Sequence, residues 1–217
     1  MKAYIFLHGE GSGAQTYRRH YDLTRAPDDV VICADGGYNT ACSVSIEPQI
    51  VVGDLDSIHE ENIDGGIEVR RYPPEKDYSD FELALTEALR LSVEGIVVYG
   101  ALGGRKDHEI INLTVTAHAG IPITLIEEEV EIHNVVTTLE ITGKKGRMCS
   151  LVAFCEGCRV RHMEGFHYTL KNEDLRPSSR GLSNVIERHK AYISLERGSL
   201  LVIIPSVGTH HNRPRRL

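Results

Sequence analysis

The chain contains no tryptophan, and aromatic residues make up only 6% of its 217 positions. It also lacks an apolar run long enough to cross a bilayer, so we expect no membrane association. The formal net charge is −7, and the basic field of a general nucleic-acid-binding protein is therefore missing. The remaining composition is that of an ordinary soluble globular protein, long enough for one large domain or two modest ones.

Cysteine usage and the first residues both indicate a reducing compartment. Five cysteines are an odd number, which suits free thiols better than a disulfide framework. The opening segment MKAYIFLHGE lacks the longer apolar core and the cleavage site of a secretory signal peptide. We therefore expect a cytoplasmic protein. Cys155 and Cys158 form a CxxC pair, but no second pair accompanies them, so a strand–turn–strand segment is favoured over a zinc site.

Strand-like and helix-like segments alternate up to about residue 129. The expected strands are 2–7, 30–33, 50–52, 67–70, 95–99 and 121–126. The expected helices are 16–23, a helix that ends near residue 43, 79–91 and 106–118. Because most of these strands are apolar throughout, they predict a parallel sheet that helices cover on both faces. The glycine-rich loop 8–13 lacks the spacing of the dinucleotide fingerprint and of the phosphate loop.

The pattern changes after residue 129, where short strand-like pieces follow one another without a long helix. They are 131–135, 137–141, 148–154, 159–163, 191–195 and 200–204. Such spacing is typical of an all-β sandwich. The predicted fold is thus α/β, with an N-terminal parallel-sheet nucleotide-binding domain over 1–129 and a C-terminal all-β sandwich over 130–217. The acidic run 127–129 is expected to be a solvated edge.

Two acidic pairs dominate the stretch from residue 53 to residue 82. Asp54 and Asp56 directly follow the apolar segment 50–52, while Asp77 and Asp80 stand at the start of the expected helix 79–91, next to Lys76. Turn formation or helix capping would explain any one of these aspartates alone. Four carboxylates with a neighbouring lysine favour a metal–phosphate site, because Mg²⁺ prefers a few carboxylates together with substrate phosphates.

Further polar residues follow other expected strands. Asp35 comes after the strand 30–33, and Arg105 and Asp107 come after the strand 95–99. The carboxyl ends of parallel strands form the ligand crevice of such a sheet. We therefore expect these residues on one rim with Asp54 and Asp56, where Arg105 at a helix start is suited to clamp phosphate.

Five segments, in order and over nearly the whole chain, resemble the thiamine pyrophosphokinase family. They are ADGGYN (34–39), VVGDLDSI (51–58), PPEKDYSDFELAL (73–85), GALGGRKDHEIIN (100–112) and RGLSN (180–184). The resemblance implies that ATP and thiamine react to give AMP and thiamine diphosphate with Mg²⁺ as cofactor. It also implies a homodimer whose active sites combine the α/β domain of one subunit with the sandwich of the other.

The resemblance also assigns roles to individual residues. The implied catalytic residues are Asp54, Asp56, Asp77 and Asp80, and the implied metal ligands are Asp54, Asp56 and Asp80. The implied ATP contacts are Asp35, Gly36, Gly37, Asn39, Lys76, Arg105 and Asp107. Ser183 and Asn184 are the implied contacts to thiamine.

The sequence departs from the family pattern in a few places, and other functions stay open. Tyr38 stands where the family motif often has alanine, and without tryptophan any aromatic packing on thiamine must come from tyrosine or phenylalanine. One alternative is a pyrophosphokinase of the same fold that acts on a hydroxymethylpterin. A second is a non-catalytic, ATP-binding regulatory protein, and a third is a metal-dependent phosphatase.

Overall fold

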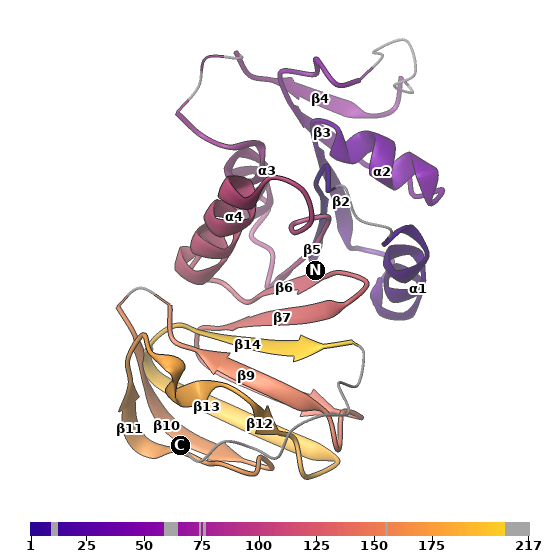
Figure 1. Cartoon of the computed structure of the whole chain (residues 1–217). Helices are drawn as coiled ribbons and strands as arrows, with labels where there is room; N and C mark the ends of the chain where they lie inside the picture. The colour runs from indigo at the N-terminus through magenta and orange to yellow at the C-terminus, as the bar shows by residue number, and fades with distance from the viewer. Residues whose placement is uncertain (10–12, 59–64, 74, 76, 155, 207–217) are drawn as a thin grey trace. The chain divides into compact units, whose positions relative to one another are not determined.

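The structure of the protein is a computed structural model that describes residues 1–9, 13–58, 65–73, 75, 77–154 and 156–206 (Figure 1). Contacts divide the chain into two compact units. The first contains Met1–Val115 and Leu125–Glu128, and the second contains Thr116–Thr124 and Glu129–Leu217. The strands belong to a large sheet and to a second, antiparallel sheet, so the fold is mixed α/β. None of the helices among the described residues is long and apolar enough to span a membrane.

The strands of the first unit lie in the order β6-β5-β1-β2-β3-β4. Their bounds are β1 Ala3–Phe6, β2 Val30–Ala34, β3 Ile50–Gly53, β4 Glu68–Arg71, β5 Ile96–Tyr99 and β6 Ile123–Ile126. β1 pairs with β2 and β5 in parallel, and β3 pairs with β2 and β4 in parallel. The predicted parallel sheet is therefore confirmed for β1 to β5. Its consequence is that the loops after β2, β3 and β5 leave the sheet at the same edge.

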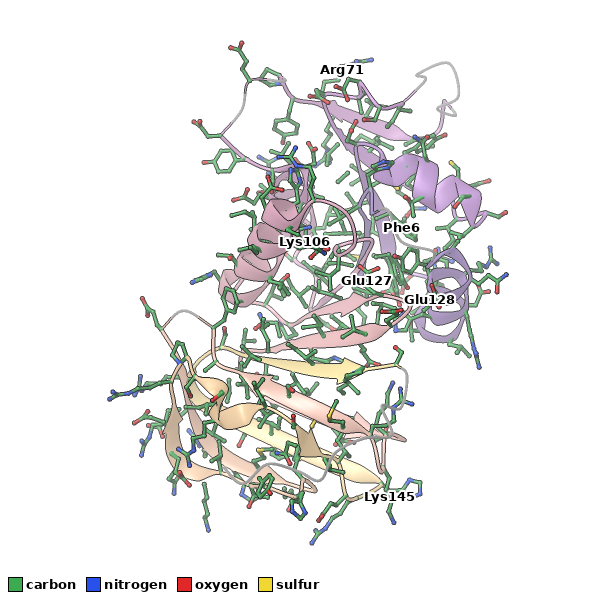
Figure 2. The ribbon with its side chains drawn as sticks, viewed as in Figure 1. Phe6, Arg71, Lys106, Glu127, Glu128 and Lys145 are labelled. Atoms are coloured by element: carbon green, nitrogen blue, oxygen red, sulfur yellow. The ribbon has the colours of Figure 1, made fainter. Side chains whose placement is uncertain are left out.

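Helices cover both faces of this sheet (Figure 1). α1 (Ala14–Thr24) and α2 (Gly37–Ser43) lie on one face, while α3 (Asp80–Arg90) and the start of α4 (Lys106–His118) lie on the other. Alternate residues of each strand therefore enter two different apolar layers. Tyr4 and Phe6 of β1 pack in the layer that also contains Tyr17 and Tyr21 of α1. Phe6 is labelled in Figure 2.

A capping box fixes the start of α3, next to the acidic stretch. The Ser79 hydroxyl accepts a hydrogen bond from the Glu82 backbone N–H at 3.3 Å, and the Glu82 carboxylate accepts one from the Ser79 N–H at 2.8 Å. This reciprocal pair satisfies two N–H groups that a helix start otherwise leaves open. Buried Phe81 and Leu85 then hold the helix on the sheet. The position of Asp80, the first helical residue, is set by these contacts.

The second unit is built from antiparallel strands in the orders β12-β9-β14-β7 and β11-β10-β13-β8. Their bounds are β7 Val130–Val135, β8 Thr138–Thr142, β9 Met148–Val152, β10 Cys158–Glu164, β11 Lys171–Leu175, β12 Asn184–Val185, β13 Lys190–Gly198 and β14 Leu200–Pro205. One apolar cluster includes Leu151 and Leu200 from the first group of strands and Val160 and Ile193 from the second. The six predicted strands are present, and β11 and β12 were not predicted.

Candidate active site

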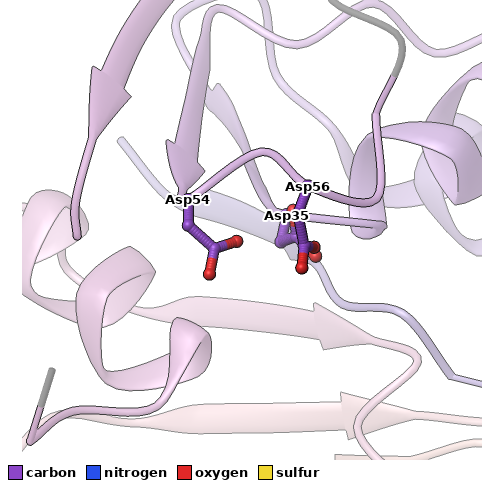
Figure 3. A group of neighbouring side chains, drawn as sticks. All are labelled: Asp35, Asp54 and Asp56. Carbon is purple, nitrogen blue, oxygen red and sulfur yellow. The ribbon is translucent and has the colours of Figure 1, made fainter. Parts of the chain in front are cut away.

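Three aspartates meet at the carboxyl ends of β2 and β3. Asp35 follows β2, and Asp54 and Asp56 follow β3, which is paired with β2 through Ala34 and Val52. One carboxylate oxygen from each aspartate lies within 4.8 Å of the others, and Figure 3 shows the three side chains gathered at this edge. The parallel register thus brings together residues that are about twenty positions apart in the sequence.

The backbone of both loops is shaped to present these carboxylates. Asp35 and Leu55 have φ values of +43° and +66°, in the left-handed region that residues other than glycine seldom adopt. Leu55 is buried in the apolar layer of α1 and α2, so it anchors the loop between the two aspartates that flank it. The Asp35 N–H donates to the Val52 carbonyl at 2.8 Å, which ties one loop to the end of the other strand. Local strain of this kind is typical of functional sites.

The donor set fits a hard divalent cation. Asp56 is exposed and Asp54 is partly exposed, whereas the Oδ1 atom of Asp35 is buried and has no hydrogen-bond partner among the described residues. Buried carboxylate oxygens are normally paired, and an unpaired one next to two other carboxylates calls for a positive partner. Mg²⁺ takes oxygen ligands of this type, so the three aspartates are suited to hold it.

A cavity of about 640 Å³ opens beside these carboxylates. It is lined by Asp35 and Asp54, by the start of α3 including Asp80, and by the loop after β5 with Arg105. This volume lies in the usual range of small-molecule sites. Of the predicted rim, Asp35, Asp54 and Arg105 thus line one cavity in the first unit, together with Asp80. The sequence reasoning did not assign roles to other lining residues, among them His8, Glu109 and Asn112.

Arg105 and Asp107 form an ion pair next to the cavity. The Arg105 Nη2 and Asp107 Oδ2 atoms are 2.6 Å apart, and a second contact from Nε to Oδ1 measures 3.2 Å. The guanidinium lowers the pKa of the Asp107 carboxyl to about 2. Asp107 also accepts a hydrogen bond from the His108 N–H at 3.1 Å, while Arg105 lines the cavity and Asp107 is not among the residues that line it. Asp107 thus holds the guanidinium through its Nε and Nη2 atoms and orients the arginine beside the cavity.

Packing explains the other residues of the ADGGYN segment. A Cβ atom on Gly37 would lie 2.0 Å from the Phe6 carbonyl oxygen, so only glycine allows α2 to approach β1 this closely. The Asn39 side chain donates to the Ser57 carbonyl at 3.0 Å and so holds the loop that carries Asp56. Gly36 and Gly37 are buried, and neither Asn39 nor these glycines lines the cavity. Their contact with ATP stays a prediction.

Glu127 is a buried residue of the site that the sequence reasoning missed. The acidic run 127–129 was expected to be a solvated edge, and for Glu127 this prediction is wrong because its exposed fraction is only 8%. Its Oε1 atom accepts a hydrogen bond from the Leu102 N–H at 3.0 Å, and its other oxygen accepts one from the Tyr17 hydroxyl. Nothing in the local sequence distinguishes Glu127 from the exposed Glu128 and Glu129.

Comparisons with known proteins give the family. Models described as "Thiamin pyrophosphokinase, catalytic domain" and "Thiamin pyrophosphokinase, vitamin B1 binding domain" match residues 22–125 and 132–200. The thiamine pyrophosphokinase of Bacillus subtilis (strain 168) is 30% identical over 201 residues, which cover 84% of this chain and 91% of that protein. The chain belongs to the thiamine pyrophosphokinase family.

Solved structures of thiamine pyrophosphokinases have the same fold. The crystal structure of the Bacillus subtilis protein matches with a TM-score of 0.79 at 25% identity, covering 95% of this chain and 100% of that one. The protein from Geobacillus thermodenitrificans matches with a TM-score of 0.77 at 22% identity and covers 96% and 99% of the two chains. Yeast thiamin pyrophosphokinase still gives 0.67 at 14% identity, over 94% of this chain and 86% of that one.

The remaining predicted site residues lie in several environments. Asp77 is exposed and belongs neither to the acidic cluster nor to the lining of the cavity, and Lys76 lies outside the described residues. In the second unit, Ser183 has a φ of +59°, and its N–H donates to the Ser150 hydroxyl at 3.2 Å. Asn184 is fully buried, and its amide bonds to the Tyr168 backbone N–H and carbonyl at 3.0 and 2.8 Å. Asn184 therefore has a structural role, and its predicted contact with thiamine stays a prediction for this member of the thiamine pyrophosphokinase family.

Proposed function

We propose that this chain transfers the pyrophosphoryl group of ATP to the hydroxyl of thiamine, giving thiamine diphosphate and AMP. The family matches support the type of reaction. The observation that carries the proposal is the convergence of Asp35, Asp54 and Asp56 beside a cavity of about 640 Å³. A cluster of carboxylates repels a triphosphate unless a divalent cation lies between them, so the cluster suits a metal–nucleotide complex.

The proposed cofactor is Mg²⁺, with Asp35, Asp54 and Asp56 as its first candidate ligands and Asp80 as a further one on the same cavity. When bound, the ion neutralises and orients phosphate oxygens. This assignment gives Asp35 a metal-binding role in addition to the predicted contact with ATP. Asp77 and Lys76 stay proposed partners of the triphosphate, on the resemblance alone.

In the proposed mechanism, the thiamine oxygen forms a bond to the β-phosphorus of ATP. The bond between that phosphorus and the oxygen it shares with the α-phosphorus breaks, so that AMP leaves. A carboxylate of the acidic cluster takes the hydroxyl proton, and Arg105, held by Asp107, stabilises charge on the phosphate oxygens. Most of the rate then comes from positioning and electrostatics.

The proposal extends to the domains, the assembly and the location of the protein. An ATP-binding α/β domain over 1–129 is proposed to precede a thiamine-binding β-sandwich over 130–217. Homodimers with shared active sites are proposed on the family resemblance. Ile110 and Ile111 are consistent with an interface, since both are large, apolar and exposed on α4. No nucleic-acid or membrane partner is proposed, and a cytoplasmic location is expected from the sequence.

The test is AMP release from ATP and Mg²⁺ by purified protein, with and without thiamine. We expect AMP only when thiamine is present, in amounts that match thiamine diphosphate. The Asp54→Asn variant should lose about a hundredfold or more of this activity, because charge stabilisation at the reacting phosphates is lost. Asp28→Asn, which removes an exposed carboxylate elsewhere in the same unit, is the matched control.

Each other outcome contradicts a separate part of the proposal. If AMP appears with a hydroxymethylpterin and not with thiamine, the acceptor is wrong. If inorganic phosphate appears without any acceptor, the reaction type is wrong. If a folded Asp54→Asn protein keeps the activity of Asp28→Asn, the carboxylate cluster does not serve the reaction.

A further inference from the structure

The loop after β5 is the most glycine-rich wall of the cavity. Gly100, Gly103 and Gly104 have φ values of +74°, +89° and +112°, and all three line the cavity together with Ala101 and Arg105. Glycine accepts such angles without strain, but it leaves the free loop with many alternative conformations. Contacts from elsewhere in the fold must therefore select the conformation that the cavity requires.

Side chains from two elements make these contacts. Asn112 of α4 donates to the Ala101 carbonyl at 2.7 Å, and Glu109 of α4 accepts from the Gly103 N–H at 2.8 Å. Glu127, just after β6, accepts from the Leu102 N–H at 3.0 Å. Glu109 and Asn112 reach the loop from the helix that follows it directly, whereas Glu127 is separated from it by the whole of α4 and β6.

The Glu127 carboxylate lies against the backbone N–H groups of the loop after β5. Burial raises the pKa of its carboxyl overall, while the Tyr17 hydroxyl and the backbone N–H groups of Leu102, Ala101 and Gly100 act in the opposite direction. Successive backbone N–H groups that point to one place form a binding site for an anion. Here the Glu127 side chain, at the end of β6, occupies that anion-binding site (Figure 2). A hydrogen bond to a charged acceptor is about twice as strong as a neutral one, so this carboxylate is a strong constraint on the loop.

Tyr17 fixes the carboxylate from the other side. Its hydroxyl donates to the second oxygen of Glu127, and its ring is 2% exposed in the aromatic layer between α1 and the sheet. Burial and the neighbouring carboxylate both raise the pKa of the Tyr17 hydroxyl, so it keeps its proton and stays a donor above the pH at which a free tyrosine ionises. The orientation of Glu127 thus depends on a residue 110 positions away in the sequence.

We infer that Glu127 is a positioning residue: together with Tyr17 it fixes the backbone of residues 100–102, and so shapes the cavity wall that leads to Arg105. Glu127 does not line the cavity, so it acts through the loop rather than on a ligand. The part of this inference that is tested through enzyme activity rests on the proposed function. The loop constraint itself can be measured without any reaction.

The test is Glu127→Gln in the full chain, because glutamine keeps the shape of the side chain and one acceptor while it removes the charge. We expect amide hydrogen exchange at Ala101 and Leu102 to rise about tenfold, since the loop loses charge-assisted hydrogen bonds. We further expect the KM for ATP to rise several-fold, while the KM for thiamine changes less than twofold. Glu129→Gln, two positions away and exposed, removes the same charge and should change none of these quantities.

Tyr17→Phe provides a second variant if Glu127→Gln does not fold. It keeps the carboxylate and removes one donor, so the same changes should appear at smaller size. Unchanged exchange at Ala101 and Leu102 in a folded Glu127→Gln protein would overturn the inference. So would faster exchange with a KM for ATP equal to that of Glu129→Gln, because the loop would then be held without any consequence for the cavity.

The test of Glu127 can be decided independently of the test of the proposed function. If the wild-type protein forms no AMP with thiamine, the reaction is wrong, and hydrogen exchange together with the Kd for ATP and Mg²⁺ still decides the role of Glu127. In that case, faster exchange with weaker ATP binding supports the positioning role. An unchanged exchange rate or an unchanged Kd rejects it.

Discussion

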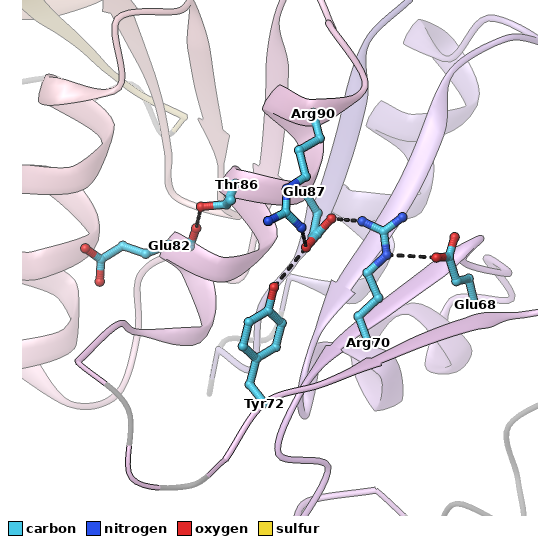
Figure 4. A network of polar contacts seen from close by, with 7 residues as sticks. All are labelled: Glu68, Arg70, Tyr72, Glu82, Thr86, Glu87 and Arg90. Carbon is cyan, nitrogen blue, oxygen red and sulfur yellow. Dashed lines mark hydrogen bonds and ion pairs between the residues drawn. The ribbon is translucent and has the colours of Figure 1, made fainter.

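Replacing Glu87 by glutamine should remove an important link between β4 and α3. The Glu87 side chain is completely buried, and three groups surround it (Figure 4). Its Oε1 atom lies 2.7 Å from Arg90 Nη1 and 2.9 Å from the Tyr72 hydroxyl oxygen, and its Oε2 atom forms an ion pair with Arg70. Two of these partners come from β4 and the residue after it, so the carboxylate ties the edge of the sheet to the helix.

The exposure of the partners sets the size of the effect. Removing one member of a buried ion pair typically costs 3–5 kcal/mol, because the other charge is left without a partner. Here the Arg70 and Arg90 side chains are 26% and 62% exposed, so water solvates them after the change. Glutamine also keeps two hydrogen-bonding groups. We therefore expect Glu87→Gln to lower the free energy of local unfolding by about 2 kcal/mol.

The cost of removing each partner of Glu87 should fall as the exposure of that partner rises. Tyr72→Phe removes one hydrogen bond to a charged acceptor and should cost about 1.5 kcal/mol. Arg90→Ala removes the more exposed ion pair and should cost less than about 1 kcal/mol. Glu94→Gln is the control, since Glu94 is 86% exposed and its only recorded ion pair among the described residues is with the N-terminal amine at 3.7 Å.

Native-state hydrogen exchange of the β4 and α3 amides measures these changes within the unit concerned. A loss of about 2 kcal/mol corresponds to a roughly thirtyfold fall in protection. If Glu87→Gln changes protection less than twofold, the buried carboxylate does not stabilise this edge. If Arg90→Ala costs as much as Glu87→Gln, exposure is the wrong guide to the strength of these ion pairs.

Two further predictions follow from single contacts. Gly37→Ala should destabilise the first unit by about 1–3 kcal/mol in urea unfolding, because the new Cβ would lie 2.0 Å from the Phe6 carbonyl oxygen, whereas Gly65→Ala, with nothing within 4 Å, should be nearly neutral. The pKa of Asp107, about 2 against an ordinary 3.8, makes its pairing with Arg105 stabilising above about pH 4 and lost as the pH falls toward 2. Arg105→Gln should return this pKa toward 3.8 in a carboxyl-carbon NMR titration, and a pKa that stays near 2 would mean that the arginine is not the cause.

Much of the fold was predictable because the elements of the first unit carry their signals locally. The buried strands are short runs of apolar residues, and the Ser79–Glu82 capping box marks the start of α3 within four residues. β11 was missed because Lys171–Leu175 is polar except at its end, and β12 because it has only two residues. Between β10 and β11, the segment 165–170 forms only an isolated bridge from Phe166 to Ile186.

The candidate site was predictable to the extent that strand ends define it. Asp35, Asp54 and Asp56 meet because the register of β2 and β3 brings them together, and the sequence pattern already predicted that they lie on one rim of the sheet. Asp80 was expected in the metal group, but the geometric cluster contains Asp35 instead, and Asp80 lies on the wall of the cavity. The role of Glu127 could not be predicted from the sequence, because its burial depends on Tyr17 and on a distant loop rather than on its own neighbours.

The charges around the cavity explain why a cation is needed if a triphosphate binds here. The chain as a whole has a formal charge of −7, so positive charge must be supplied locally. In the described part of the site, the two basic side chains at the start of α4 already have acidic partners: Arg105 faces Asp107 at 2.6 Å, and Lys106 faces Glu109 at 2.8 Å. On the other side, three carboxylates converge, and one of their oxygens is buried without a hydrogen-bond partner among the residues that the structure describes. These side chains alone therefore leave the cavity negative, and a divalent cation held by the aspartates is the group that reverses its sign for an anionic substrate.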